Sequence, residues 1–270
     1  MKKYGKLIIA FMWLGLTMIM IVGATFAWFS ENRTVEANGM SVQAEASKNL
    51  LISNASDGTY GISAASTLTA VTKLAPSSTT NLSSFFAATT DTKQSKVDYA
   101  TGNLLSGAAM EAVTPTTENP NPADTVVNVA KHTFYVKLDG ISGAQLYKLY
   151  VNTLTVQNNT PADAAQNISK ALRVGVKCGD NVYIYAPVTG ASTTYSGITS
   201  TAAATGAVTN LKAAPASTDV LAATVVVGTT LTVEVFIWYE GQDPACTSAN
   251  SINVEQLNVK LTFTANDTNE

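Results

Sequence analysis

The sequence predicts a mainly β protein, a two-sheet antiparallel sandwich of jelly-roll-like form with one short helix, preceded by an N-terminal hydrophobic helix. Three observations predict this class. The second half holds several segments in which apolar and polar residues alternate, the pattern of half-buried strands. Threonine, serine, alanine, asparagine and valine dominate, which favours strands and turns over long surface helices. Long strands joined by long connections suggest two packed antiparallel sheets.

An apolar run near the N-terminus, residues 7–29, predicts an export signal or a membrane anchor. It carries no charge and follows three lysines. A hydrocarbon core about 30 Å thick needs roughly 20 apolar residues of helix, so the length of this run favours an anchor. The lysines should stay in the cytoplasm, which places the rest of the chain outside the cell.

Small residues at the end of the run favour cleavage instead. They fit a cut after Ala27, with Ala24 as the alternative. The predicted organisation is a signal peptide or membrane anchor at residues 1–27, then a single extracellular β-sandwich domain at residues 28–270. An uncleaved chain would be held in the membrane through residues 7–29.

The charge content excludes one class of partner. Charged residues make up 13% of the chain and the net charge is −3, so we expect no basic surface that neutralises phosphates. Nucleic-acid binding is therefore not expected. The roughly 240 residues after the leader suffice for one domain with a substantial core.

Two cysteines, Cys178 and Cys246, lie at the ends of predicted strands. An exported chain meets an oxidising environment, in which two thiols can form a disulfide. Two free buried thiols are the alternative, because bridging requires a short Cα separation that a sequence does not define.

The first two predicted strands follow the leader closely. Residues 34–46 alternate from Met40 onward, and residues 50–52 form a short apolar run. Residues 54–124 then form an insertion rich in serine, threonine and alanine. A structureless loop of that length is unusual in a compact domain, so we expect short strands and turns there, with room for one short helix.

The second half is more regular. Residues 133–138 alternate, and residues 147–156 alternate with a slip near Asn152 that predicts a β-bulge. Thr160, followed by proline and an acidic residue in the first turn, predicts a short helix over residues 161–169.

A hairpin is the strongest local prediction. Residues 171–178 and 182–186 alternate on either side of a Gly-Asp-Asn turn at residues 179–181, whose residue types tolerate a positive φ. Two long alternating strands, residues 229–240 and 254–265, should end the chain.

The two ends of the chain resemble a known family. The junction GATFAWFS at residues 23–30 precedes a strand that ends in NLLIS, and the run VFIWYEGQDPAC at residues 235–246 precedes the C-terminal strand. Together they resemble the TasA/camelysin group of secreted Gram-positive proteins. The resemblance implies a jelly-roll domain that polymerises into matrix fibres, in which the N-terminal strand of one subunit completes a sheet of the next.

The candidate donated strand lies between the leader and the domain. Its apolar positions are Val35, Met40, Val42 and Ala44. Cleavage would free a tethered strand, which can add to an exposed sheet edge through main-chain hydrogen bonds. The alternative is that this strand pairs within its own domain.

The residue inventory argues against an enzyme. His132 is the only histidine, so a zinc motif with two histidines is excluded, and neither a nucleophile elbow nor a phosphate-binding loop occurs. We therefore expect no catalytic residue, no metal and no cofactor. The metalloprotease activity described for some camelysin relatives does not carry over. His132 is expected to be a solvated or hydrogen-bonded residue at the start of a strand.

Two groups of residues could form a ligand site on the surface. Glu240, Gln242 and Asp243 bring oxygen ligands together as a calcium site would, but Gly-Gln-Asp-Pro is also an ordinary turn, which we favour. The aromatic residues are expected in the core and on sheet surfaces rather than on a carbohydrate-binding face. These residues are Tyr183, Tyr185, Trp238 and Tyr239.

The sequence thus predicts an exported cell-surface or extracellular-matrix structural protein that associates with itself or with other surface proteins. The most specific form of this prediction is a fibre subunit that donates its N-terminal strand. The alternative is a membrane-tethered, adhesin-like module that binds a glycan or a protein through two segments rich in serine, threonine and alanine, residues 54–124 and 187–218. The second segment should be a surface loop.

Overall fold

A computed structural model places most of the chain after residue 40. It describes residues 41–46, 50–67, 73–88, 97–98, 103–104, 110–117, 126–139, 147–158, 168–202, 204–246 and 257–267. The chain divides into two compact units, residues 1–34 and 35–270, and every described residue belongs to the second. The predicted leader, with its cleavage positions Ala24 and Ala27, lies outside the described residues. Within the described ranges, no helix has the length and apolar character needed to cross a membrane.

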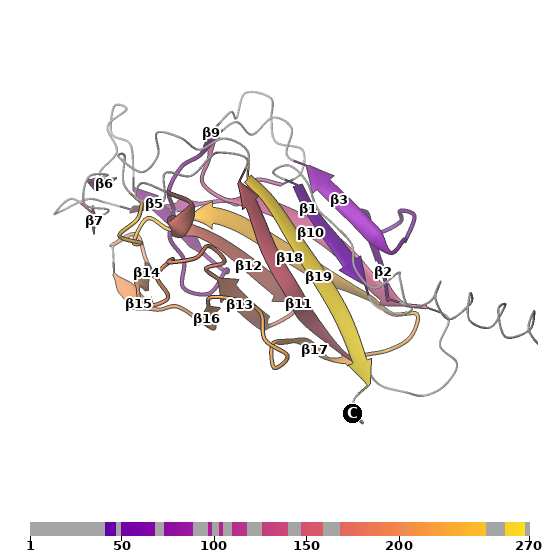
Figure 1. Ribbon diagram of the computed structural model, residues 1–270. Helices are drawn as coiled ribbons and strands as arrows, with labels where there is room; N and C mark the ends of the chain where they lie inside the picture. Colours follow the sequence, from indigo (N-terminus) through magenta and orange to yellow (C-terminus); the bar gives the residue numbers. More distant parts are fainter. Residues whose placement is uncertain are drawn as a thin grey trace, which may run out of the picture. The chain divides into compact units, whose positions relative to one another are not determined.

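Two large sheets dominate the fold, which is mainly β (Figure 1). Sheet A contains, in order, β17 (Val220–Val225), β11 (Tyr147–Asn158), β19 (Leu257–Asp267), β1 (Ser41–Ala46) and β3 (Ser63–Thr67). Sheet B contains, in order, β16 (Leu211–Lys212), β13 (Asn181–Tyr185), β12 (Leu172–Cys178), β18 (Thr230–Tyr239), β10 (Ala130–Leu138) and β2 (Leu50–Ser53).

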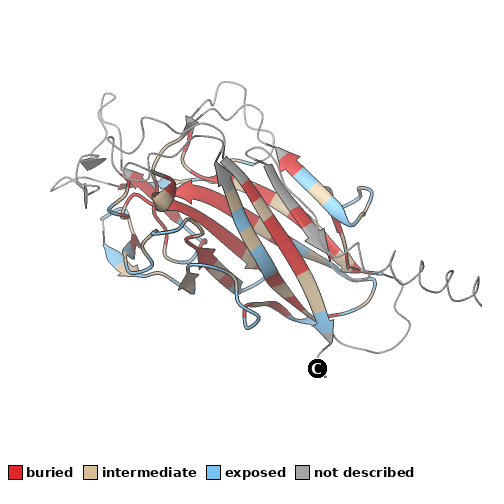
Figure 2. Ribbon diagram, in the orientation of Figure 1, coloured by how far each residue is buried: buried red, intermediate tan, exposed pale blue. Residues whose placement is uncertain are grey.

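The inner faces of sheets A and B share one apolar core (Figure 2). Strand β10 alternates as predicted, whereas β18 alternates only up to Val235 and is buried continuously over residues 235–239. Phe134 and Val235 point inward. Leu149 and Leu261 meet them from sheet A. Burial of apolar side chains from both sheets is the main stabilising contribution in such a core.

Four short strand pairs and one 3₁₀ turn complete the described structure. The pairs are β4 (Lys73–Leu74) with β9 (Val126–Val127), β5 (Phe85–Ala88) with β8 (Met110–Val113), β6 (Val97–Asp98) with β7 (Asn103–Leu104), and β14 (Ser196–Ile198) with β15 (Thr205–Ala207). The described parts of the insertion thus contain short strands, as predicted. Of the helix predicted over residues 161–169 only the end is described, where η1 (Ile168–Ala171) forms the 3₁₀ turn.

Two local predictions are confirmed. Strands β12 and β13 form the hairpin, with Cys178 paired to Asn181 and a positive φ at Gly179 alone, as in a type II′ turn. In β11 the register with β19 shifts between Val151 and Thr153, so Asn152 is the extra residue of a bulge.

One topological prediction is wrong. Sheet A is not purely antiparallel, because β1 runs parallel to β19 while it pairs antiparallel with β3. The alternation of a strand reports which side chains share a face but not the direction of a partner far away in sequence. The parallel pairing therefore left no signal in the sequence.

A third layer covers the outer face of sheet B. It is formed by the strap, which we define as residues 75–88. Phe85 packs between the rings of Phe236 and Trp238, with centroid separations of 5.6 and 5.4 Å. Leu82 lies over Gly175, where an added Cβ would approach Leu82 Cδ2 to 2.5 Å. This packing explains why β18 is buried on both faces.

The segment predicted as a surface loop, residues 187–218, is partly buried and contains short strands. It carries β14, β15 and β16, and Ile198 within it is fully buried. The Ile198 amide donates to Ser78 Oγ in the strap at 3.0 Å. The prediction of a surface loop is therefore wrong for this part of the segment, because its apolar residue closes against the strap.

Candidate functional site

The candidate donated strand occupies an interior position in sheet A. Strand β1 lies between β19 and β3 (Figure 1). Val42 is opposite Val259 and Ala44 is opposite Leu261 in the parallel pair. Ala44 is fully buried, as are both partners on β19. The strand therefore bonds through its main chain on both sides and contributes a small side chain to the core.

Removal of β1 would leave a gap in sheet A. Strand β3 has no other strand partner within the described ranges, and β19 would keep only β11 beside it. The freed β19 edge would expose main-chain N–H and C=O groups, which can template the addition of another strand. The slot between β19 and β3 is thus the candidate functional site.

The structure shows the alternative that the sequence left open. Val42 and Ala44 belong to a strand that pairs within its own domain. Val35 and Met40, the other two predicted positions, lie outside the described residues. Donation of this strand to a second copy stays a prediction.

His132 and Ser66 connect the two sheets beside this slot. Ser66 of β3 and His132 of β10 are both buried, and Ser66 Oγ lies 2.6 Å from His132 Nδ1. His132 Nε2 finds no hydrogen-bond partner within the described ranges. Burial lowers the pKa of His132 to about 4, since the charged ring would be desolvated. The histidine is hydrogen-bonded, as one interpretation predicted, but it is not solvated.

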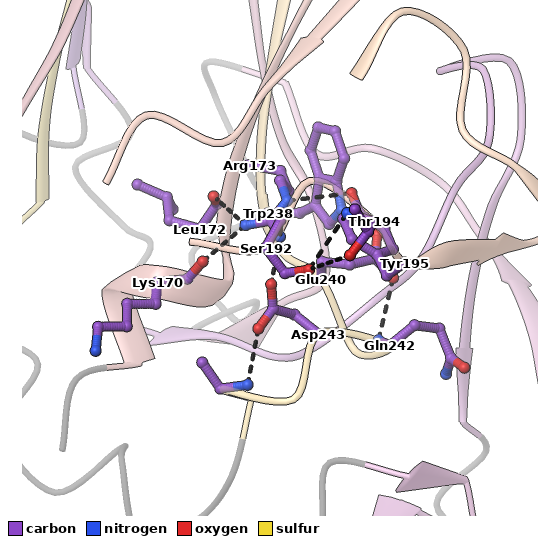
Figure 3. Close-up of polar contacts among 11 residues, drawn as sticks. Lys170, Leu172, Arg173, Ser192, Thr194, Tyr195, Trp238, Glu240, Gln242 and Asp243 are labelled. Carbon is purple, nitrogen blue, oxygen red and sulfur yellow. Dashed lines mark hydrogen bonds and ion pairs between the residues drawn. The ribbon is translucent and has the colours of Figure 1, made fainter. Parts of the chain in front are cut away.

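A buried polar cluster lies at the end of β18 (Figure 3). Arg173 of β12 is fully buried and forms an ion pair with Asp243. Its five N–H groups are all used, with acceptors Tyr195 Oη, Asp243 Oδ2 and the carbonyls of residues 170, 172 and 192. Asp243 in turn accepts from the Ala245 amide at 2.7 Å. Such complete satisfaction is what a buried guanidinium requires.

Glu240 is the second carboxylate of the cluster. Its side chain is fully buried and accepts from Trp238 Nε1 and the Gln242 amide, each at 3.1 Å, and from the Ser78 hydroxyl. Burial raises the pKa of Glu240 to about 7 in spite of these donors. The Glu240 amide donates to the Ala171 carbonyl at 2.8 Å, which ties the cluster to η1.

These contacts support the turn interpretation of the acidic segment. Residues 241–245 form a turn, as favoured, and both carboxylates face N–H and O–H donors. Calcium would need the same oxygens as ligands. The polar groups at this turn therefore fasten β12, β18 and the strap together.

For Cys178 and Cys246 the structure shows the alternative to a disulfide. Both thiols are free and buried. Cys178 ends β12, whereas Cys246 follows Tyr239, which pairs with Leu172 at the start of that strand. A strand rises about 3.3 Å per residue, so the length of β12 lies between Cys178 and the strand end that precedes Cys246. Burial raises the pKa of both thiols.

The aromatic residues lie where the favoured interpretation put them. Tyr185, Trp238 and Tyr239 are buried. Tyr183 is half-buried and stacks on Tyr185 with ring centroids 6.4 Å apart. These rings are packed against neighbouring side chains and do not form a carbohydrate-binding platform.

Comparisons with known proteins add no family to this picture. No family model matches the chain, and searches of the curated proteins and of the solved structures find no similar protein. The resemblance to the TasA/camelysin group therefore rests on the residues at the two ends of the sequence.

Proposed function

We propose that the chain is an exported structural protein of the cell surface or extracellular matrix, and that it forms fibres by donating β1 to a neighbouring copy. The position of β1 carries this proposal. A strand that is held in the interior of a sheet can be replaced by the same strand of a second copy without a change in contacts. The predicted leader comes just before it, so cleavage would release the chain end that carries β1.

The path of the chain supports a jelly roll. Sheet A holds the order β1-β19-β11-β17, and sheet B holds the order β10-β18-β12-β13. From β10 onward the long strands alternate between the sheets, apart from the β12–β13 hairpin. Two four-stranded sheets connected in this manner are the arrangement of a jelly roll. The parallel direction of β1 departs from an all-antiparallel jelly roll, as expected if β1 is a separate, exchangeable element.

The described parts of residues 54–124 and 187–218 support a structural role over a binding module. The strap packs its apolar residues into the outer face of sheet B, and Ile198 closes against it. Two of the polar groups with shifted pKa values, His132 and Glu240, are buried inside the domain. Their hydrogen bonds join β10 to β3 and the end of β18 to the strap.

The first experiment determines the N-terminus and the intact mass of the protein recovered from culture medium and from membranes. The proposal expects a soluble species that starts at Trp28 or Thr25 and forms filaments in negative-stain micrographs. A protein found only in membranes with Met1 retained would overturn it, because the strand end would stay tethered. A cleaved protein that remains monomeric at high concentration would also overturn it.

A further inference from the structure

Three asparagines make the same kind of contact in this fold. Each donates its side-chain amide to a main-chain carbonyl of a strand that is outermost in its sheet or, for β13, covered by only a two-residue strand. Asn54 Nδ2 lies 2.9 Å from the Ala65 carbonyl of β3, Asn181 Nδ2 lies 3.0 Å from the Leu221 carbonyl of β17, and Asn210 Nδ2 lies 2.7 Å from the Val182 carbonyl of β13.

The strands that receive these contacts are the ones with unpaired margins. Strands β3 and β17 are the two outermost strands of sheet A, and β13 is covered by β16 at only two residues. The fourth margin, β2, is bridged through its main chain, with Ile52 and Gly61 exchanging hydrogen bonds of 2.7 and 3.0 Å. Within the described ranges, a local contact is therefore present on β3, on β17, on β2 and on the part of β13 that β16 does not cover.

We infer that Asn54, Asn181 and Asn210 are edge caps that keep a second copy of this chain from adding laterally to the sheets. An unpaired strand edge is a template for another strand, and natural proteins block such edges. A side-chain amide that occupies a carbonyl removes an acceptor on which an incoming strand depends. Every copy of the chain presents the same strand edges. A second copy is therefore the partner that an open edge would meet most often.

This inference goes beyond the proposed function and does not depend on it. Edge caps would prevent lateral pairing of strand edges and leave other modes of association, such as strand donation, possible. They would have the same effect in a protein that stays monomeric. Asn181 and Asn54 reach across from the partner sheet or its connection, so each cap also fixes one side of the two-sheet packing.

The test compares single variants of the full-length chain, purified in one detergent, by light scattering coupled to size-exclusion chromatography. The test variants are Asn54→Ala, Asn181→Ala and Asn210→Ala. The control is Asn81→Ala, since Asn81 also makes one hydrogen bond to the main chain, to the Ser83 amide at 3.0 Å, but does so in a turn of the strap.

We expect the three test variants to keep the circular dichroism of the wild type and to raise the mean particle mass about twofold, as pairing of two copies requires. The control should behave as the wild type. Lysine at the same three positions should prevent this association, because a charged side chain also blocks a strand edge.

Three outcomes would overturn the inference. The first is folded alanine variants that remain at the mass of the wild type. The second is association of the Asn81→Ala control to the same extent. The third is unfolding of the alanine variants, which would show that the asparagines serve the fold and not the edge.

Discussion

Ala44 of β1 lies opposite Leu261 of β19, and both side chains are fully buried although the two residues are separated by most of the chain. This pair anchors β1 in the core. Ala44→Asp should therefore destabilise the docking of β1, because an unpaired charge would be buried, at a cost of about 3 kcal/mol or more. Hydrogen exchange should show lost protection in β1 and β3 and unchanged protection in the β12–β13 hairpin.

The control for this variant is Gln43→Asp. Successive residues of a strand alternate between the two faces of a sheet, so this variant places the charge one position away from Ala44 in the same strand. This variant should leave hydrogen exchange in β3 close to that of the wild type. Equal loss of protection in both variants would contradict the assigned position of Ala44.

Two buried groups should give opposite pH dependence of stability. The pKa of Glu240 is raised to about 7 in the folded state, so its contribution is present below its ordinary value of 4.5 and is lost as the pH rises through 7. The pKa of His132 is lowered to about 4, so its contribution is present above 6.5 and is lost as the pH falls through 4. Between pH 4.5 and 6.5 the two effects nearly cancel.

Variants should separate these two effects. In urea unfolding of the full-length chain in detergent, Glu240→Gln should make stability rise with pH more steeply than in the wild type, by about 1 kcal/mol per pH unit. His132→Asn should change the slope by a similar amount in the opposite direction. Parallel profiles of the wild type and both variants across pH 4.5–6.5 would show that neither group titrates as described.

Replacement of only one partner of the Arg173–Asp243 ion pair should strongly lower the free energy of unfolding. Arg173→Met leaves the carboxylate of Asp243 buried without its cation, and such changes cost about 3–5 kcal/mol. Adding Asp243→Asn to this variant removes the stranded charge and should restore part of the loss. Urea unfolding of the single and double variants measures both steps. A double variant less stable than Arg173→Met would mean that the charge of Asp243 is not the source of the cost.

The close approach of the strap to β14 makes Gly197 sensitive. A Cβ at Gly197 would lie 2.3 Å from the main-chain oxygen of Thr79, whereas a Cβ at Gly175 would meet only the movable side chain of Leu82. Gly197→Ala should therefore destabilise the protein by about 1–3 kcal/mol, and Gly175→Ala by less. Thermal unfolding ranks the two variants. The reverse ranking would contradict the packing of the strap.

Local pattern was enough to predict the elements whose partners are near in sequence. The β12–β13 hairpin needs only its turn residues and its alternation, and the bulge at Asn152 appears as a slip in alternation. The alternation expected over residues 229–240 fails in its second half, where residues 235–239 form a continuous apolar run and β18 is buried on both faces. Such a run does not identify the distant segment that covers it.

Contacts between distant residues could not be predicted in this manner. Arg173 belongs to an alternating strand that also carries Lys177, so the local pattern does not show that it is buried, and its partner Asp243 lies far along the chain. The link between Ser66 and His132, and the separation of the two cysteines along β12, depend on which strands become neighbours. Pairing and direction of strands follow from the packing of the whole domain.

Covalent trapping of β1 tests the central claim most directly. Gln43 and Lys260 are opposite each other in the β1–β19 pair, so Gln43→Cys with Lys260→Cys, in a chain with Cys178 and Cys246 replaced by alanine, can form a disulfide across it. The protein would be recovered from culture medium, oxidised and examined by non-reducing electrophoresis. Thr155→Cys with Lys260→Cys is the matched control, because β11 pairs with β19 inside one chain.

If β1 passes between copies, the first variant gives a ladder of covalent multimers that collapses on reduction, and the control gives only internally bridged monomers. If the first variant also gives only monomers, β1 stays in its own domain and the proposed assembly is wrong.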